Sequence, residues 1–512
     1  RIGGLSVELE EIRSNVVGAQ LGEEAISTSL MAGAIGLAIV FVFMCMVYLL
    51  PGLASSLALV IYTGLILVLL NAFDITLTLP GIAGIILGIG MAVDANVIIF
   101  ARVKEELTAG KSVKSALNAG FHKAMSAILD GNITTLIAAA VLWLKGSGTV
   151  KGFAQTLALG IVVSMFTALV ITRMIVYAFY AVGIRNTKLY GRIKEERAPI
   201  DFLGKRKIFF AVSVAVILIG FVFMGVNAGT GKGALNYSLE FKGGTSISAD
   251  FGKDYTVEQV EDKIVPEVAK VINDNAIQAS TVSGSNVVTI KTKTLSLSER
   301  EEVNQMLVDK FGVDESTIES QSIGSTISNE MRSNAVKALI VACIFMLFYI
   351  WFRFKDIRFA GSAIIALVHD VLVMLTGYAL IRISVGNTFI ACILTIVGYS
   401  INDTIVIFDR IRENMQGMKK QTPETLAEVA NRSLTQTLSR SLNTSITTII
   451  MVLLLFILGV SSIREFALPL MIGLISGTYS SIFIAAALWY VMKLHLGKDK
   501  LLKPAVAKTK KK

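Results

Sequence analysis

The sequence is poor in the residues on which soluble and secreted domains depend. Only 17% of its 512 residues are charged, against about 25% in soluble globular domains. With 54% hydrophobic residues and a mean hydropathy of +0.67, the composition excludes a single water-soluble core, a disordered chain and a collagen-like repeat. The three cysteines, Cys45, Cys343 and Cys392, lie in apolar runs. Their spacing fits no disulfide framework and no metal site.

The net charge of +10 does not indicate nucleic-acid binding, because the basic residues lie in short loops and in the tail at 508–512. Such loops are instead typical of the cytoplasmic side of a membrane protein. Apolar runs near 20 residues predict membrane-spanning helices. We expect eleven, at 28–50, 53–73, 80–101, 124–145, 153–181, 207–227, 333–352, 359–381, 388–409, 441–459 and 464–492. Tight connections are expected at Pro51-Gly52 and at 351–358.

The basic loops predict the orientation. They lie between the third and fourth, fifth and sixth, seventh and eighth, and ninth and tenth spans. With the lysine-rich C-terminus, these loops all fall on one side, which we assign to the cytoplasm. The polar segment 228–332 and the N-terminus are then expected outside.

The chain contains an internal repeat. Gly90–Glu105 reads GMAVDANVIIFARVKE and Gly398–Glu413 reads GYSINDTIVIFDRIRE, at an offset of 308 residues. A second match, with an offset of 313, relates NITTLIAAA at 132–140 to SITTIIMVL at 445–453, and a third, with an offset of 306, relates 17–21 to 323–327. Three matches in order indicate duplication. Both halves share one orientation, so we expect a pseudo-twofold axis along the membrane normal.

The segment 228–332 has the pattern of one α+β domain. A strand or strand pair is expected at 237–251 with a bend at Gly243-Gly244, then a helix at 256–270, strands at 277–282 and 286–293 around the turn 283–285, a helix at 296–311 and a strand at 317–323. The order βαββαβ predicts a ferredoxin-like domain. By comparison of the halves, residues 1–27 are interpreted as the end of a mostly missing first outside domain.

Charged side chains at membrane depth are costly, at least ~2.5 kcal/mol on insertion scales, and therefore mark functional candidates. Asp94 lies in the third span, and Gly90 on the same face allows close helix approach. Asp403 lies in the ninth span, although the repeat aligns Asn402 with Asp94. Each carboxyl could change protonation, or could be a neutral group that joins helices. Arg440 begins the tenth span and is followed by the polar stripe Asn443, Thr444, Thr447 and Thr448.

Arg440 keeps its charge and could stabilise a deprotonated carboxylate, for which Asp403 is the expected partner. The alternative is an interfacial anchor. His369-Asp370 in the eighth span and Asp130 in the fourth are candidate members of a proton relay. The alternative for His369-Asp370 is a hydrogen-bonded pair that holds helices together. For Asp130, whose repeat equivalent is Asn443, both readings remain open.

The motifs carry a family resemblance. GMAVDANVIIFARVKEE resembles the fourth-helix motif of SecD and GYSINDTIVIFDRIREN that of SecF, while LEFKGGT and NRSLTQTLSRSLNTSITT resemble further SecF segments. All lie in order on one chain. The sequence therefore resembles a fused member of the SecD/SecF protein-export family, in the RND superfamily, with the SecD part truncated at its N-terminus.

The resemblance implies an accessory factor of the bacterial Sec translocase, driven by a proton or sodium gradient and acting on preproteins outside the membrane. By the motif match, the essential carboxylates of the family correspond to Asp94 and Asp403, and its essential arginine corresponds to Arg440. It implies no cofactor and no enzyme activity, a multi-pass location in the bacterial cell membrane with a cytoplasmic C-terminus, and SecYEG, unfolded preprotein, lipid, YajC and a YidC-type insertase as partners.

The same comparison divides the chain. The expected parts are the end of the SecD outside domain at 1–27, a SecD-like membrane domain at 28–181, a linker at 182–206, the first SecF-like helix at 207–227, the SecF-like outside domain at 228–332, a SecF-like membrane domain at 333–492 and a basic tail at 493–512. The alternatives are an RND-type exporter of small molecules or lipids, for which 228–332 is short, and a passive scaffold, which has no need of buried charges. A hydrolase is disfavoured, because adjacent His369 and Asp370 diverge on a helix.

Overall fold

The computed structural model divides into two compact units. The sheet unit comprises Arg1–Thr28, Asn236–Lys337 and Ser384–Asn387, and the helical unit comprises Ser29–Leu235, Ala338–Ile383 and Thr388–Lys512. The structure describes residues 13–16, 19–146, 148–191, 198–231, 233–274, 277–281, 286–416, 418 and 421–496, and the side chains of these residues except for 13–24 and 461.

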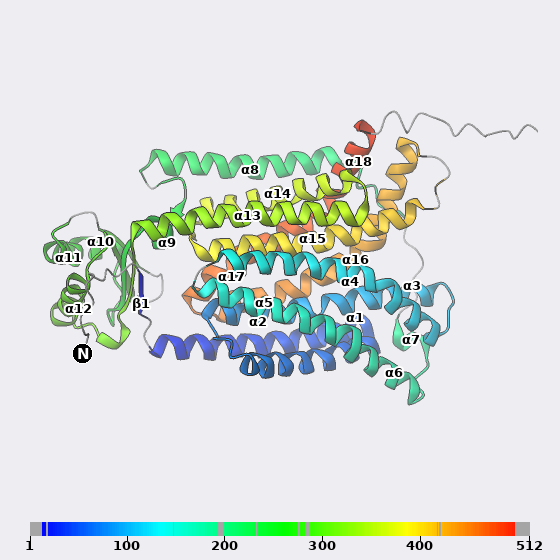
Figure 1. Ribbon diagram of the computed structural model, residues 1–512, viewed down its shortest axis with the longest axis horizontal. Helices are drawn as coiled ribbons and strands as arrows, with labels where there is room; N and C mark the ends of the chain where they lie inside the picture. Colours follow the sequence, from blue (N-terminus) through cyan, green and yellow to red (C-terminus); the bar gives the residue numbers. More distant parts are fainter. Residues whose placement is uncertain are drawn as a thin grey trace, which may run out of the picture. The chain divides into compact units, whose positions relative to one another are not determined.

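The helical unit is built from long apolar helices that run alongside one another (Figure 1). Within the described residues, ten helical stretches are long and apolar enough to cross a membrane. The first half contains α1 (Ala19–Ala72), α2 (Leu79–Ala92), α3 (Asp94–Thr108), α4 (Val113–Lys145), α5 (Thr149–Phe166), the π-helix η1 (Thr167–Thr172) and α6 (Arg173–Ala181). The second half contains α13 (Ser325–Phe354), α14 (Ile357–Ile381), α15 (Asn387–Met415), α16 (Pro423–Leu458), α17 (Ser461–Tyr479), the π-helix η3 (Ser480–Ala485) and α18 (Ala486–His495). Between the halves lie α7 (Thr187–Tyr190) and α8 (Arg206–Gly229).

The first two predicted spans lie within α1, which reverses direction at a kink. Leu49 has non-helical angles (φ 57°, ψ −125°) and is followed by Pro51, which cannot donate a backbone hydrogen bond. The Ser56 hydroxyl donates to the carbonyl of Phe41, 15 positions earlier, at 3.4 Å. The chain therefore doubles back into two antiparallel segments. Ten helical stretches thus contain the eleven expected spans.

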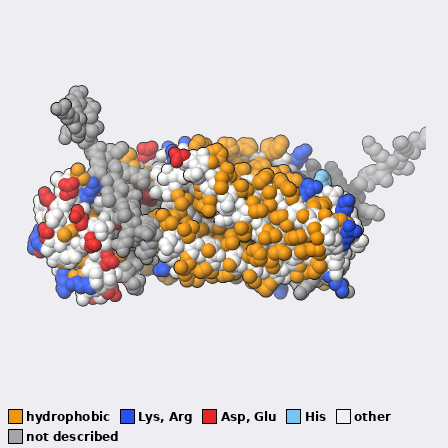
Figure 2. Space-filling model, turned by 90° about the horizontal axis from the view of Figure 1, so that it is seen from below, with side chains coloured by type: hydrophobic (Ala, Val, Ile, Leu, Met, Phe, Trp, Pro, Cys, Tyr) orange, Lys and Arg blue, Asp and Glu red, His pale blue; other side chains and the backbone are white. Residues whose placement is uncertain are grey.

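A broad band of hydrophobic side chains covers the flank of the helical unit, and Lys and Arg gather at one end (Figure 2). We call this the basic end; α3 and α15 finish there and α4, α14 and α16 begin there. At this end α13 and α14 are joined by only two residues, Lys355 and Asp356. Burial alone would raise the pKa of Asp356, but hydrogen bonds from Arg358 outweigh burial and hold its pKa below the usual range. The predicted tight connections at 51–52 and 351–358 are both present.

The two π-helices occupy equivalent places in the two halves. η1 spans Thr167–Thr172 and η3 spans Ser480–Ala485, so that each end of one is 313 residues from the same end of the other. This is the offset of the second sequence match. π-helices are rare and concentrate at functional sites.

The sheet unit consists of a five-stranded sheet with helices packed on it and a separate pair of short strands. Its elements are β1 (Arg13–Val16), β2 (Asn236–Tyr237), α9 (Leu239–Lys242), β3 (Gly244–Asp250), α10 (Val257–Lys263), α11 (Val265–Ile272), β4 (Gln278–Thr281), β5 (Val287–Thr292), α12 (Leu297–Phe311), the 3-10 turn η2 (Glu315–Thr317), β6 (Glu319–Ile323) and β7 (Ser384–Val385). The main sheet has the order β1-β6-β3-β5-β4, and every neighbouring pair is antiparallel. β2 pairs with β7 in parallel.

Two local expectations for the sheet unit are wrong. Residues 239–242 form the helix α9 instead of a strand, because Gly243 (φ 77°) and Gly244 (φ 120°) turn the chain between α9 and β3, which begins at Gly244. The helix expected at 256–270 is divided at Ile264 into α10 and α11, since Pro266 supplies no amide hydrogen to continue the first helix. The turn expected at 283–285 lies outside the described residues.

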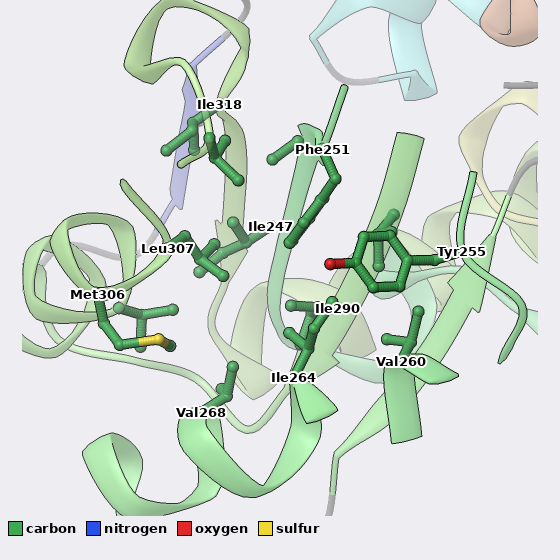
Figure 3. Packing of buried hydrophobic residues seen from close by; sticks show 14 of the residues in the cluster. Ile247, Phe251, Tyr255, Val260, Ile264, Val268, Ile290, Met306, Leu307 and Ile318 are labelled. Carbon is green, nitrogen blue, oxygen red and sulfur yellow. The ribbon is translucent and has the colours of Figure 1, made fainter. Parts of the chain in front are cut away.

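Alternating residues of β3 and β5 form the core of the sheet unit with the helices that cover the sheet (Figure 3). Ile247 from β3 and Ile290 from β5 are each 1% exposed. They pack in one cluster with Val260, Ile264 and Leu307 from the helices. The period-two pattern of a half-buried strand thus places the apolar residues on the helix-covered face.

Two glycines let helices of opposite halves cross closely. A Cβ atom on Gly90 of α2 would lie 3.0 Å from the Thr448 Cα of α16, and one on Gly398 of α15 would lie 3.0 Å from the Thr135 Cα of α4. The Thr135 hydroxyl also donates to the Gly398 carbonyl at 3.1 Å. Small residues at such crossings let helix backbones approach inside a membrane.

We predict that Gly398→Val will destabilise the helical unit by ~1–3 kcal/mol, because the added side chain overpacks the α15–α4 crossing. Thermal melting in detergent measures the effect. Gly64→Val is the matched control, since a Cβ on Gly64 of α1 would meet nothing within 4 Å. Equal melting temperatures for the two variants would contradict the importance of the crossing.

Candidate functional site

Asp94 and Asp403 lie buried in the middle of the helical unit. Asp94 begins α3, directly after Val93, the single residue between α2 and α3, and it is 5% exposed. Asp403 lies within α15 and is 7% exposed. The two carboxylates interact electrostatically with each other, and the Tyr399 hydroxyl interacts with both. The structure therefore brings together two acidic residues that are 309 positions apart in the sequence.

Hydroxyl groups of α16 line this site. The Tyr399 hydroxyl lies 3.0 Å from the Thr448 hydroxyl, and the Thr444 hydroxyl donates to Asp403 Oδ1 at 3.5 Å. Thr444 and Thr448 are buried, with exposures of 4% and 0%. One buried acceptor, Asp94 Oδ1, has no hydrogen-bond partner. A buried carboxyl oxygen without a donor is a place where a proton or a cation would be bound.

Arg440 lies near the middle of α16 (Pro423–Leu458) and is close to the same site. Its side chain is 6% exposed, and its Nε has no hydrogen-bond partner. Among the residues that the structure describes, no carboxylate lies within the 4.0 Å of an ion pair with Arg440. Asp403 is near enough to interact electrostatically. The expected Arg440–Asp403 ion pair is therefore not formed in this structure, although the two charges interact electrostatically.

The repeat residue of Asp94 lies on the other side of α15. Asn402 is packed over Gly131 of α4 so closely that a Cβ on Gly131 would lie 1.8 Å from Asn402 Oδ1. This Oδ1 is also buried without a hydrogen-bond partner. The two halves thus place a carboxylate in one crossing and an amide in the other.

Asp130 is part of an ion pair between the halves. Arg353 Nε donates to Asp130 Oδ2 at 2.5 Å, and the Tyr349 hydroxyl donates to Asp130 Oδ1 at 2.8 Å. Its repeat equivalent, Asn443, donates to the Tyr48 hydroxyl at 3.0 Å. In both places a tyrosine of one half therefore binds a polar side chain of the other half. These contacts favour a structural reading of Asp130.

Asp370 is the most completely buried carboxylate near the site, with 0% exposure. Its Oδ1 accepts from Ser476 at 2.7 Å and lies 3.1 Å from His369 Nδ1. Its Oδ2 accepts from Ser400 at 2.7 Å and from Ser480 at 2.8 Å. Asp370 thus joins α14 to α15, α17 and the π-helix η3. Both carboxyl oxygens of Asp370 thus have hydrogen-bond partners, whereas Asp94 Oδ1 has none.

The serines around Asp370 were missed by the sequence analysis, although Ser476 and Ser480 are spaced four residues apart on one helix face. In the first half the equivalent residue is Tyr62, because ALVIY at 58–62 aligns with ALVHD at 366–370 at the offset of 308. Tyr62 is fully buried, and its hydroxyl, which has no hydrogen-bond partner, fills the space beside Gly88 and Gly160. The buried carboxylate of Asp370 with its three serine donors, which we call the Asp370 hub, therefore has no counterpart at the equivalent position of the first half.

Four charged residues at the basic end were also missed as a group. Arg102 and Glu105 belong to α3, and Arg410 and Glu413 belong to α15. We call them the quartet. Their alignment in the repeat, at the common offset of 308, was the signal that could have found them.

The arrangement suits the binding of a small cation better than covalent chemistry. The described residues contain no group of three or more His, Cys, Asp or Glu side chains placed to hold a metal ion. The central site instead combines two buried carboxyls, one arginine and several hydroxyls. These features define a multi-pass helical membrane protein with an ionisable centre between its two halves.

Comparison with known proteins gives the family. A family model described as "Protein export membrane protein SecD/SecF, C-terminal" matches residues 3–182 and 303–495. The SecDF translocase subunit of Bacillus subtilis is 38% identical over 96% of this chain and 67% of its own length. That of Thermus thermophilus is 38% identical over 95% of this chain and 64% of its own. The chain belongs to the SecD/SecF protein-export family, and it spans about two thirds of these relatives.

Solved structures agree with this membership. The crystal structure of SecDF from Thermus thermophilus matches 94% of this chain and 64% of that chain, with a TM-score of 0.85 and 36% identity. A crystal structure of SecDF in a super-membrane-facing form matches 95% of this chain and 64% of that chain, with a TM-score of 0.72 and 35% identity. The fold of the family therefore extends over nearly the whole chain.

Asp370→Ala should lower the stability of the helical unit by ~2 kcal/mol, because it leaves the buried hydroxyls of Ser400 and Ser476 without an acceptor. Thermal melting of the detergent-solubilised protein measures this. Asp262→Ala, on the exposed face of α10, is the control and should leave melting nearly unchanged. A melting temperature for Asp370→Ala equal to that of the control would show that the hub contributes nothing.

Proposed function

We propose that this chain is the motor part of an accessory factor of the Sec translocase, which uses a transmembrane ion gradient, a proton gradient by family resemblance, to promote preprotein export. The family membership supports the export role, because the relatives are named as protein translocase subunits. The observation that carries the motor role is the burial of Asp94, Asp403 and Arg440 together between the two halves.

The mechanism rests on the open Arg440–Asp403 pair. A guanidinium stays charged, so only the carboxyl groups can take up and release the coupling ion. When Asp403 is ionised, Arg440 is attracted to it, and the α16 and α15 helices are drawn together. When Asp403 binds a proton, that attraction is lost. Binding and release of the ion thereby favour two different helix packings.

The structure of the two halves supports a shared origin and a rocking motion. The Gly90–Thr448 and Gly398–Thr135 crossings, the two tyrosine contacts and the two π-helices are each related by the repeat. We infer a pseudo-twofold axis along the membrane normal. The order βαββαβ with the sheet order β6-β3-β5-β4 supports a ferredoxin-like domain in the sheet unit.

We place the basic end in the cytoplasm, and with it the C-terminus, because basic loops concentrate on that side of membrane proteins. By the topology predicted from the sequence, the segment 228–332 would then be outside the cell, where it would meet the unfolded preprotein emerging from SecYEG. YajC and a YidC-type insertase are the further partners that we propose from family resemblance. No cofactor is required beyond the coupling ion.

We expect Asp403→Asn to abolish gradient-dependent stimulation of export while leaving membrane insertion intact, because the amide cannot exchange the ion. Arg440→Lys should also be poorly active, since lysine lacks the planar fork. Translocation of a preprotein into inverted membrane vesicles measures the effect, with a protonophore or a sodium ionophore added to identify the ion. Asp74→Asn, an exposed carboxyl between α1 and α2, is the control.

The proposal would fail if Asp403→Asn still responded fully to the gradient. Asp403 would then be a neutral group that joins helices. A response lost equally in Asp74→Asn would point to general damage to the protein.

A further inference from the structure

The quartet forms two ion pairs across the interface of the halves. Arg102 Nη1 of α3 lies 3.0 Å from Glu413 Oε2 of α15, and Arg410 Nη2 of α15 contacts Glu105 Oε1 of α3. Each arginine also binds the glutamate three residues later on its own helix, at 3.1 Å for Arg102 and 3.2 Å for Arg410. The cross-pairs are thus related by the same repeat as the central site.

The quartet lies between the central site and the basic end. Arg102 is eight residues after Asp94 and Arg410 is seven after Asp403, which corresponds to ~12 Å and ~10 Å along a helix. The arginine side chains are 6% and 10% exposed, while both glutamates are 41% exposed. The arginines therefore point inward and the glutamates outward. Arg440 interacts electrostatically with both arginines.

Two inward arginines would obstruct a cation that moves from the central site to the basic end. An arginine cannot discharge itself by losing its proton. In a site of low dielectric constant, its charge repels a cation strongly. The obstruction persists as long as the cross-pairs hold both guanidinium groups in place. Opening the cross-pairs requires α3 and α15, and with them the two halves, to separate at this end.

We propose that the quartet is the gate of the ion path at the basic end, closed in this structure by the Arg102–Glu413 and Arg410–Glu105 cross-pairs. This inference rests on the proposed function, because it assumes that an ion passes through the Asp94–Asp403 site. It adds four gating residues to the three coupling residues. The gate prevents the ion from crossing unless the halves rock.

Other ionic groups at this end flank the gate. Asp409 lies 3.9 Å from Arg102, 3.6 Å from Arg353 and 3.0 Å from Arg412. Arg353 in turn forms an ion pair with Asp130. The repeat equivalent of Asp409 is Ala101, so this extension exists on one side only. Both halves contribute an arginine and a glutamate to the quartet, whereas only the second half contributes Asp409.

The test is ion leakage in liposomes that contain the purified chain and a pH-sensitive dye, with a sodium-sensitive dye in a parallel preparation. Glu105→Gln with Glu413→Gln should raise the leak of the coupling ion several-fold over the unmodified protein, because both arginines lose their cross-partners. Adding Asp403→Asn to this variant should remove the extra leak. Glu106→Gln is the matched control, since Glu106 pairs with Lys111 and Lys123 of the first half, and should not leak.

Removing the inward charges tests the same gate from its other side. Arg102→Gln with Arg410→Gln should also raise the leak, because the two buried charges that repel the cation are gone. Melting in detergent confirms that each variant is folded.

A Glu105→Gln, Glu413→Gln variant as tight as the unmodified protein would overturn the gate, and so would an Arg102→Gln, Arg410→Gln variant that does not leak. Neither result bears on the motor, which the Asp403→Asn export assay tests separately. If Asp403→Asn left export stimulation intact, the motor would fail even if the quartet controlled a leak. An extra leak that persists with Asp403→Asn would show a path that avoids the site, and this too would overturn the proposal.

Discussion

The close crossing of helices from opposite halves is the constraint on which the rest of the helical unit depends. At Gly90 and Gly398 the backbones approach until a single added carbon would be in tight contact. A lipid-facing bundle gains nothing from the hydrophobic effect between its helices, so it depends on such packing and on polar contacts. The crossings exclude water and lipid from the space where Asp94, Asp403 and Arg440 meet. The burial of these charges therefore follows from the absence of side chains at two positions.

Buried ionic groups are stable only where other groups compensate them, and the four buried acidic residues differ in how far they are compensated. Asp370 accepts from three serines, and Asp130 is paired with Arg353. Asp94 keeps one oxygen without a donor, and Asp403 interacts electrostatically with Arg440 without forming an ion pair. The satisfied groups hold helices in place. The unsatisfied ones retain the capacity to bind an ion, which is why the proposed motor is assigned to them.

The proposed duplication accounts for features that the two halves of the helical unit share, and divergence would account for those that differ at the site. Both halves retain the crossing glycine, the π-helix and the Arg-Glu pair of the quartet. They differ where chemistry is expected: Asp94 corresponds to Asn402, Asn443 to Asp130, and Tyr62 to Asp370. A symmetric pair of ionisable sites would respond identically to an ion. Under the proposed ion coupling, the exchange of carboxylates for amides and a tyrosine would make the two halves respond differently.

The sequence by itself determined the long apolar helices and the matched motifs, and it predicted the buried charged residues Asp94, Asp403 and Arg440, because hydropathy and motifs are local properties of the chain. It also predicted the order of helices and strands in the sheet unit, apart from α9 and the division at Ile264, where two glycines and a proline changed the local backbone. Only the tertiary structure decided which polar groups meet. Ser476 and Ser480 reach Asp370, Arg353 reaches Asp130, and Arg102 reaches Glu413 from helices far apart in the chain. Such contacts depend on how helices rotate and cross, and the packing of the whole bundle sets these angles.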